Sequence, residues 1–169
     1  MNEPHASRPF MPGYGVQGSN EGTGLLPWGW AEERLTASRN YWVISLWPDG
    51  RPHAMPVWGV WDRRYLWFSS GGRSRKTRNL VADPRCVVAV ENATDPLIME
   101  GYAEVFKEVD PLAEVLALIN GKYSTDYSME LMDPGVNTTF RVRLHWAFGL
   151  VGDDFEGSPT RWVLKDGDE

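Results

Sequence analysis

Three short runs of β-branched and aromatic residues, joined by tight-turn sequences, most constrain the fold of this chain. The runs are YWVISLW (41–47), HAMPVWGVW (53–61) and YLWFSS (65–70). Such residues favour strands, and the PDG and WDRR sequences between them favour tight turns, so the pattern predicts an antiparallel meander. Pro56 cannot donate a ladder hydrogen bond. We therefore expect its strand to lie at an edge, at a bulge or against a ligand.

The rest of the chain adds strands and short helices. We predict strands at 86–92, 97–109, 138–152 and 160–164, and helices at 27–38, 73–82 and 110–121. The sum is a mainly β protein (α+β) with about six or seven antiparallel strands and about three peripheral helices. A small closed barrel would hide the sheet edges. Residues 1–26, rich in glycine, are interpreted as an irregular arm or one ordered by packing on another surface, and 27–169 as one folded domain.

Composition excludes several classes of protein. One cysteine in 169 residues rules out a disulfide framework or a cysteine-rich metal site. No apolar run approaches the ~20 residues that span a bilayer, and no secretory signal is visible, so we expect a cytoplasmic protein without a membrane partner. The formal net charge of −6 argues against nucleic acid as a general partner. His5, His53 and His145 lack metal-ligand spacing, and we expect no metal.

Positive charge nevertheless gathers on SSGGRSRKTRN (69–79), which contains Arg73, Arg75, Lys76 and Arg78. Its two glycines permit a tight turn between the third strand and a helix. A helix N-terminus attracts anions through its free N–H groups and dipole, and basic side chains bind phosphate. The segment is consistent with a phosphate site and equally with a solvated helix face. It lacks the spacing of a P-loop, which argues against nucleoside triphosphate hydrolysis.

The sequence contains no recognisable hydrolytic site. Ser69 and Ser70 lack the G-x-S-x-G setting of a nucleophile, and Cys86 lies in an apolar run where a buried thiol is expected. Any chemistry would therefore be carried by a cofactor, and the sequence assigns no catalytic residue.

The combined pattern resembles the pyridoxamine 5′-phosphate oxidase-like superfamily, and more narrowly its flavin/deazaflavin oxidoreductases. The resemblance rests on the DGRPH turn, the PVWG strand, the S-x-K-x-x-N-L-x-x-D-P segment after the third strand and the later IMEGYAEV. It covers about residues 27–109, with TRW at 160–162 as a weaker second anchor.

The resemblance implies an FMN-binding type of split β-barrel that forms a homodimer with cofactor sites at the subunit interface. It implies F420 or FMN as cofactor, and hydride transfer to or from a small planar organic substrate. In such proteins the PVWG strand flanks the cofactor ring, here Met55, Pro56, Val57, Trp58 and Gly59. The phosphate site would comprise Ser69, Ser70, Arg73, Ser74, Arg75 and Lys76, and the other subunit would add Arg161 and Trp162.

The resemblance leaves the cofactor and the activity open. The number of basic residues favours F420 slightly, because its oligoglutamate tail adds negative charge beyond the phosphate. Alternatives are a protein that binds or stores FMN, F420 or haem without turnover, an FMN-dependent pyridoxamine-phosphate-oxidase-like enzyme, and a polyanion binder. By residue type alone, candidates to stack on a substrate are Trp58, Trp61 and Trp162, and candidate proton donors are Tyr123, Tyr127 and His145.

Overall fold

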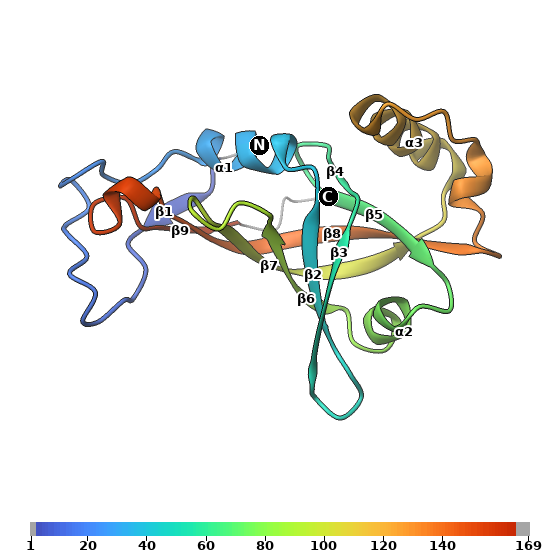
Figure 1. Cartoon of the computed structure of the whole chain (residues 1–169), viewed down its shortest axis with the longest axis horizontal. Helices are drawn as coiled ribbons and strands as arrows, with labels where there is room; N and C mark the ends of the chain where they lie inside the picture. Colours follow the sequence, from blue (N-terminus) through green and yellow to red (C-terminus); the bar gives the residue numbers. More distant parts are fainter. Residues whose placement is uncertain (1–2, 165–169) are drawn as a thin grey trace.

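A nine-stranded antiparallel sheet dominates the structure, a computed structural model that describes residues 3–164 (Figure 1). The strands are β1 (His5–Ser7), β2 (Tyr41–Leu46), β3 (Pro52–Val57), β4 (Val60–Trp61), β5 (Leu66–Gly71), β6 (Arg85–Val90), β7 (Leu97–Phe106), β8 (Asn137–Gly149) and β9 (Thr160–Val163). The helices are α1 (Trp28–Ala37), α2 (Arg75–Ala82) and α3 (Val109–Tyr123), with 3₁₀ turns η1 (Met129–Met132) and η2 (Gly152–Asp154).

The sheet curls without closing. Its strand order is β1-β9-β8-β7-β6-β2-β3, and β5 pairs with β4 and with the first half of β8. Within residues 3–164, β3 forms no ladder with β5, so the expected closed barrel is wrong and the barrel is split at this seam. Pro52 and Pro56 lack N–H groups, which weakens β3 as a template for a further strand. The prediction that Pro56 lies on an edge strand is confirmed.

The structure contains two more strands than expected. Residues 5–7 of the N-terminal arm pair with β9, and the predicted strand 53–61 is interrupted at Trp58-Gly59. α3 also differs from the prediction, because it begins at Val109, continues through Gly121 and ends where Ser124 adopts a left-handed conformation with φ 55°. Glycine in a helix interior is tolerated at a modest cost, so Gly121 alone was a poor guide to the end of the helix.

The main core lies inside the curl of the sheet. Alternate residues of β2 point inward, so Tyr41 and Val43 are fully buried while Trp42 is exposed. α1 covers one end of this core with its buried Ala31 and Leu35, and α3 forms a second cluster with β4 and β5. α2 lies beside the β2–β3 hairpin (Figure 1). No helix among residues 3–164 is long and apolar enough to cross a membrane.

Candidate cofactor site

The start of α2 is held to the end of β5 by a network of hydroxyl groups. Ser74 is the N-cap, and its Oγ accepts the Thr77 N–H at 3.3 Å and is hydrogen-bonded to Ser70 Oγ at 3.1 Å. Thr77 Oγ1 donates to the Gly71 carbonyl at 3.0 Å. The N–H groups of Arg75 and Lys76 in the first helical turn have no partner within the helix and remain available to an anion.

The basic side chains of this segment have no acidic partners in the part of the chain that the structure describes. Among residues 3–164, none of Arg73, Arg75, Lys76 and Arg78 forms an ion pair with a carboxylate. Arg75 is half-buried, and its Nε is enclosed without a hydrogen-bond acceptor. Burial lowers the pKa of Lys76 because desolvation penalises its charged form. Arg8 and Arg34 have an enclosed Nε as well, but their remaining guanidinium N–H groups meet carbonyl oxygens or a carboxylate. Among residues 3–164 the Arg75 guanidinium has neither kind of acceptor, and this difference supports an anion site.

A second group of residues completes this site and was missed at the sequence level. The Arg75 guanidinium lies 4.0 Å from the centre of the Trp47 ring, and Arg51 lies 4.7 Å from the same ring. His53 packs edge-on against Trp47 at 5.9 Å, and its Nδ1 is buried without a partner. The hairpin turn and α2 are distant in sequence, so no local spacing signals this contact.

A hollow of about 590 Å³ lies next to the start of α2. One wall is the segment from Gly71 to Ser74 and the other is the loop from Pro134 to Val136, with Thr138 between them. Gly72 N–H donates to the Val136 carbonyl at 2.9 Å, which fixes the two walls to each other. Arg73 lines this hollow, so positive charge extends beyond the helix terminus itself.

The predicted ring-flanking residues lie together at the seam edge, but they differ in access. Met55, Pro56 and Trp58 are exposed, whereas Val57 and Gly59 are buried. A Cβ atom at Gly59 would lie 2.8 Å from the Trp67 carbonyl oxygen, which explains why glycine is required there. Only the first three side chains are therefore free to touch a ligand.

The last turn of α3 holds this segment in place. Trp58 stacks on Tyr123 with ring centres 4.2 Å apart and planes 6° apart. Tyr123 Oη accepts the Gly59 N–H at 2.8 Å and donates to the Arg39 carbonyl at 2.6 Å. Lys122 Nζ donates to the Gly59 carbonyl at 3.0 Å, and burial lowers the pKa of Lys122 to about 8.

Of the three tryptophans expected to stack on a substrate, Trp61 and Trp162 lie in the core. Trp162 is 0% exposed and packs between Trp28 and Trp30, with ring centres 5.8 and 6.1 Å away. A ring enclosed by its own subunit cannot touch a ligand in another, so the expectation for Trp162 is wrong. Trp61 is also buried. Arg161 is half-exposed on the outer face of the sheet.

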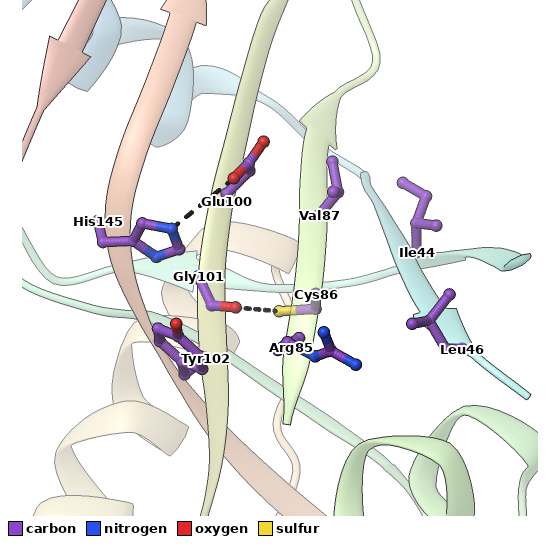
Figure 2. Close-up of a pocket in the computed structure, with 9 residues that line it drawn as sticks. All are labelled: Ile44, Leu46, Arg85, Cys86, Val87, Glu100, Gly101, Tyr102 and His145. Atoms are coloured by element: carbon purple, nitrogen blue, oxygen red, sulfur yellow. Dashed lines mark hydrogen bonds and ion pairs between the residues drawn. The ribbon is translucent and has the colours of Figure 1, made fainter. Parts of the chain in front are cut away.

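A smaller hollow of about 270 Å³ opens on the outer face of the sheet (Figure 2). Ile44, Leu46 and Val87 form its apolar side. On the opposite side His145 Nε2 lies 3.7 Å from Glu100 Oε2, and the Tyr102 ring stacks 5.1 Å from the imidazole (Figure 2).

A bulge between β7 and β8 produces this arrangement. His145 has no Cα partner in the ladder, because Glu100 pairs with Trp146 and Gly101 with Leu144. Of the three proton-donor candidates, His145 therefore lies in a hollow, Tyr123 is engaged by the backbone, and Tyr127 is exposed.

Comparison with solved structures agrees with this architecture. A structure described as an F420 reductase is 25% identical, with a TM-score of 0.54, over 67% of this chain and 91% of that one. The haem storage protein HutZ from Vibrio cholerae (15% identity, TM-score 0.58) covers 69% and 88%. A conserved hypothetical protein from Mycobacterium tuberculosis (20% identity, TM-score 0.64) covers 85% and 92%. The last two likenesses establish the fold alone.

The sequence itself matches a known family over most of the folded domain. No curated protein matches the chain. The family model described as pyridoxamine 5′-phosphate oxidase matches residues 31–149, from α1 to the end of β8. This chain therefore belongs to the pyridoxamine 5′-phosphate oxidase family of split-barrel proteins.

Proposed function

We propose that this chain is an oxidoreductase that binds F420 or FMN with the cofactor phosphate at the start of α2. The observation that carries the proposal is the buried Arg75 Nε, which has no acceptor among residues 3–164. A phosphate oxygen would provide that acceptor and would neutralise two basic side chains that have no carboxylate partner. When bound, the flavin or deazaflavin ring supplies hydride transfer to or from a small planar substrate.

The chain's own residues bind and orient the cofactor. Arg75 and Lys76 would hold the phosphate by charge-assisted hydrogen bonds, and the hydroxyl groups of Ser70 and Ser74 border the same position. The Arg75 guanidinium packs over the Trp47 ring, and this contact limits the conformations of the Arg75 side chain. This arrangement organises the site before the ligand arrives, which reduces the entropy lost on binding.

The hollow lined by Arg73 favours F420 over FMN. FMN ends at its phosphate, whereas F420 continues into a chain of carboxylates. FMN has no group beyond its phosphate that would occupy the hollow of about 590 Å³ beside the phosphate site, whereas the carboxylate chain of F420 would. Arg73 lines this hollow and supplies positive charge to it. We therefore propose F420 as the preferred cofactor.

The ring would lie against the exposed side chains of Pro56 and Trp58, because Met55 neighbours Pro56 in β3 and points to the opposite face. Trp58 is held flat by Tyr123, so its indole offers a fixed wall for a planar molecule. Pro56 has no N–H group to leave unpaired when a ligand covers it.

We further propose a homodimer formed through the outer face of the sheet. Trp42, Ile98 and Tyr102 point outward there and are 36–44% exposed. An apolar patch of this kind on one subunit marks an interaction surface. The acidic net charge of −6 disfavours nucleic acid as a partner, and the buried Cys86 suits a reducing compartment, so we place the enzyme in the cytoplasm.

The proposal is tested by titrating the purified chain separately with FMN and F420. We expect F420 to bind more tightly, and the double variant Arg75→Ala/Lys76→Ala to lose at least about a hundredfold in affinity, since each charge-assisted contact is worth roughly 1.5–3 kcal/mol. Arg78→Ala, an exposed charge on the same helix, is the matched control and should change affinity less than about threefold. Unchanged affinity in the double variant would refute the phosphate assignment.

A second candidate function is ligand binding without turnover, with haem as the ligand. The hollow on the outer face favours it, because His145 lies beside apolar walls there and imidazole is a common haem ligand. One structural neighbour is also described as a haem storage protein. A Soret band that appears with added haem and vanishes in His145→Ala would support this candidate. Hydride transfer from bound reduced F420 to a quinone or enone would support the oxidoreductase instead.

A further inference from the structure

The N-terminal arm and the loop before β9 form one lobe at the end of the molecule. We call residues 8–26 and 150–159 the N-terminal lobe, which lies at the end of the sheet opposite α3 (Figure 1). Backbone bonds join its two segments, since Gln17 N–H donates to the Glu156 carbonyl at 3.0 Å and Gly24 N–H to the Gly157 carbonyl at 3.1 Å. Both segments lie outside residues 31–149, which match the family model. The lobe therefore belongs to the part of this chain that its family match does not explain.

Two charged side chains hold the lobe together from within. Arg8 donates to the carbonyl oxygens of Gly18 and Gly157, both at 2.8 Å. The Asp154 carboxylate accepts the N–H groups of Thr23 at 2.7 Å and of Gly157 at 3.0 Å. These bonds fix a glycine-rich segment that would otherwise lose much conformational entropy on ordering. The lobe is thus organised before any partner binds, which reduces the entropy lost on binding.

The surface of the lobe is aromatic. Phe10 is 92% exposed, Tyr14 59% and Phe155 40%. The Tyr14 and Phe155 rings come from the two different segments, and their centres lie 6.0 Å apart. Single exposed hydrophobic residues are common on proteins, but aromatic side chains that two distant segments bring together on an ordered lobe indicate an interaction surface.

Negative charge surrounds these rings. The N-terminal lobe contains one basic residue, Arg8, and four acidic residues, Glu21, Asp153, Asp154 and Glu156. Its net charge of −3 is half of the formal net charge of −6 of the whole chain. Glu156 lies beside the aromatic pair, because a Cβ atom at Gly15, the neighbour of Tyr14, would lie 2.9 Å from Glu156 Oε1. Within residues 3–164 Glu156 forms no ion pair, so its charge is free to attract a cation.

We propose that the N-terminal lobe binds a basic, partly apolar segment of another protein. An arginine of such a segment would pack on the Tyr14 and Phe155 rings and donate to the Glu156 carboxylate, because a planar guanidinium makes both kinds of contact. An aliphatic neighbour would cover Phe10. An acidic or purely polar partner would gain neither contact. The lobe adjoins β1 and β9, whereas α2 contacts β2, β5 and β7, so this inference does not rest on the proposed cofactor site.

Peptide binding tests the charge and the apolar character of the partner separately. Three labelled twelve-residue peptides are titrated with the full-length chain by fluorescence anisotropy. The first contains four arginines and four leucines, the second has glutamates in place of the arginines, and the third has serines in place of the leucines. We expect the first to bind at least about tenfold more tightly than either of the others. Equal affinity for the first and third peptides would reduce the interaction to general charge attraction and overturn the inference.

Substitutions in the lobe test where the first peptide binds. Tyr14→Ser/Phe155→Ser should weaken its binding at least about tenfold, and Glu156→Gln about threefold. Tyr127→Ser/Glu130→Gln is the matched control, since it changes an exposed aromatic and an exposed acidic residue outside the lobe, and it should alter the affinity less than about twofold. A loss in this control as large as the loss in the lobe variant would place the peptide elsewhere and overturn the inference.

Two further measurements exclude misfolding and a second copy of this chain. Phe10→Ser changes a side chain that is 92% exposed, so it should keep the wild-type melting temperature and still weaken binding of the first peptide about threefold. Analytical ultracentrifugation should give the same sedimentation coefficient for the wild-type chain and for Tyr14→Ser/Phe155→Ser. Self-association that is lost in this variant and that the first peptide does not displace would assign the surface to a second copy and overturn the basic partner.

Discussion

Tyr123→Phe should uncouple the Trp58-Gly59 segment from α3 while leaving the aromatic stack intact. The substitution removes one oxygen atom and keeps the ring that packs 4.2 Å from Trp58. The lost hydroxyl accepts the buried Gly59 N–H at 2.8 Å and donates to the Arg39 carbonyl at 2.6 Å. The Gly59 N–H is left without this acceptor, although the Gly59 carbonyl keeps its bond from Lys122.

The expected cost follows from these two bonds. Leaving a buried donor unsatisfied costs roughly 1–3 kcal/mol, whereas losing a bond to a partly exposed carbonyl costs about 0.5–1.5 kcal/mol. We therefore expect Tyr123→Phe to lower the free energy of unfolding by about 2–3 kcal/mol. At roughly 2–4 °C per kcal/mol for a domain of this size, the melting temperature should fall by about 4–12 °C.

Urea titrations followed by tryptophan fluorescence measure the change, with equal m values required for the comparison. Tyr127→Phe is the matched control because Tyr127 is 45% exposed. A surface change of this kind should stay within about 0.5 kcal/mol. A Tyr123→Phe variant as stable as the control would show that the Gly59 N–H finds another acceptor and that α3 does not fix this segment.

Three further predictions concern the sheet and its faces. Trp42→Glu should shift the dimer to monomer in analytical ultracentrifugation, because it places a charge in the proposed apolar interface; a dimer of unchanged affinity would refute that interface. Gly101→Ala should lower the free energy of unfolding measured in urea by at least about 1–3 kcal/mol, because its Cβ would lie 2.5 Å from the Arg143 carbonyl oxygen. Gly121→Ala is the control: it has open space around it and should raise the free energy of unfolding by about 0.5–1 kcal/mol. Burial lowers the pKa of Lys122 from its usual value of 10.5 to about 8. Between these two pH values the unfolded chain therefore binds more protons than the folded chain, so folding stability rises with pH. Wild-type stability relative to Lys122→Met should therefore rise from pH 8 to 9.5, and a constant difference would contradict this.

The sequence predicted what depends on neighbouring residues and missed what depends on distant ones. The β2–β3 and β4–β5 hairpins, the edge position of Pro56 and the helix that follows the two glycines are local features, because turn and strand preferences act over a few residues. The expected continuous meander is interrupted, since β3 and β5 do not pair within residues 3–164. The pairing of β1 with β9 joins residues more than 150 positions apart, and no short pattern in either strand specifies it. The same holds for the stacking of Arg75 on Trp47, which depends on how the hairpin folds back onto α2.

The burial of Trp162 has a related cause. The T-R-W motif indicates two neighbouring residues, and in a strand neighbours point to opposite faces. Arg161 and Trp162 therefore could not both face one ligand. The alternation places one of the two residues in the core, and the full burial of Trp162, with the partly buried Ala6 opposite it, shows that Trp162 is that residue.

Arg75 and Arg161 differ from other arginines of the chain in what they contact, and this difference supports an anion site. The chain contains 23 acidic and 17 basic residues, so carboxylates are not scarce. Arg85 and Arg141 each pair with one, yet Arg75 rests on the Trp47 ring and Arg161 on the Ser7 hydroxyl. An aromatic ring and a hydroxyl restrict a guanidinium without cancelling its charge, whereas a carboxylate does both. Two arginines fixed in this way, one at the start of α2 and one in β9, therefore keep their charge.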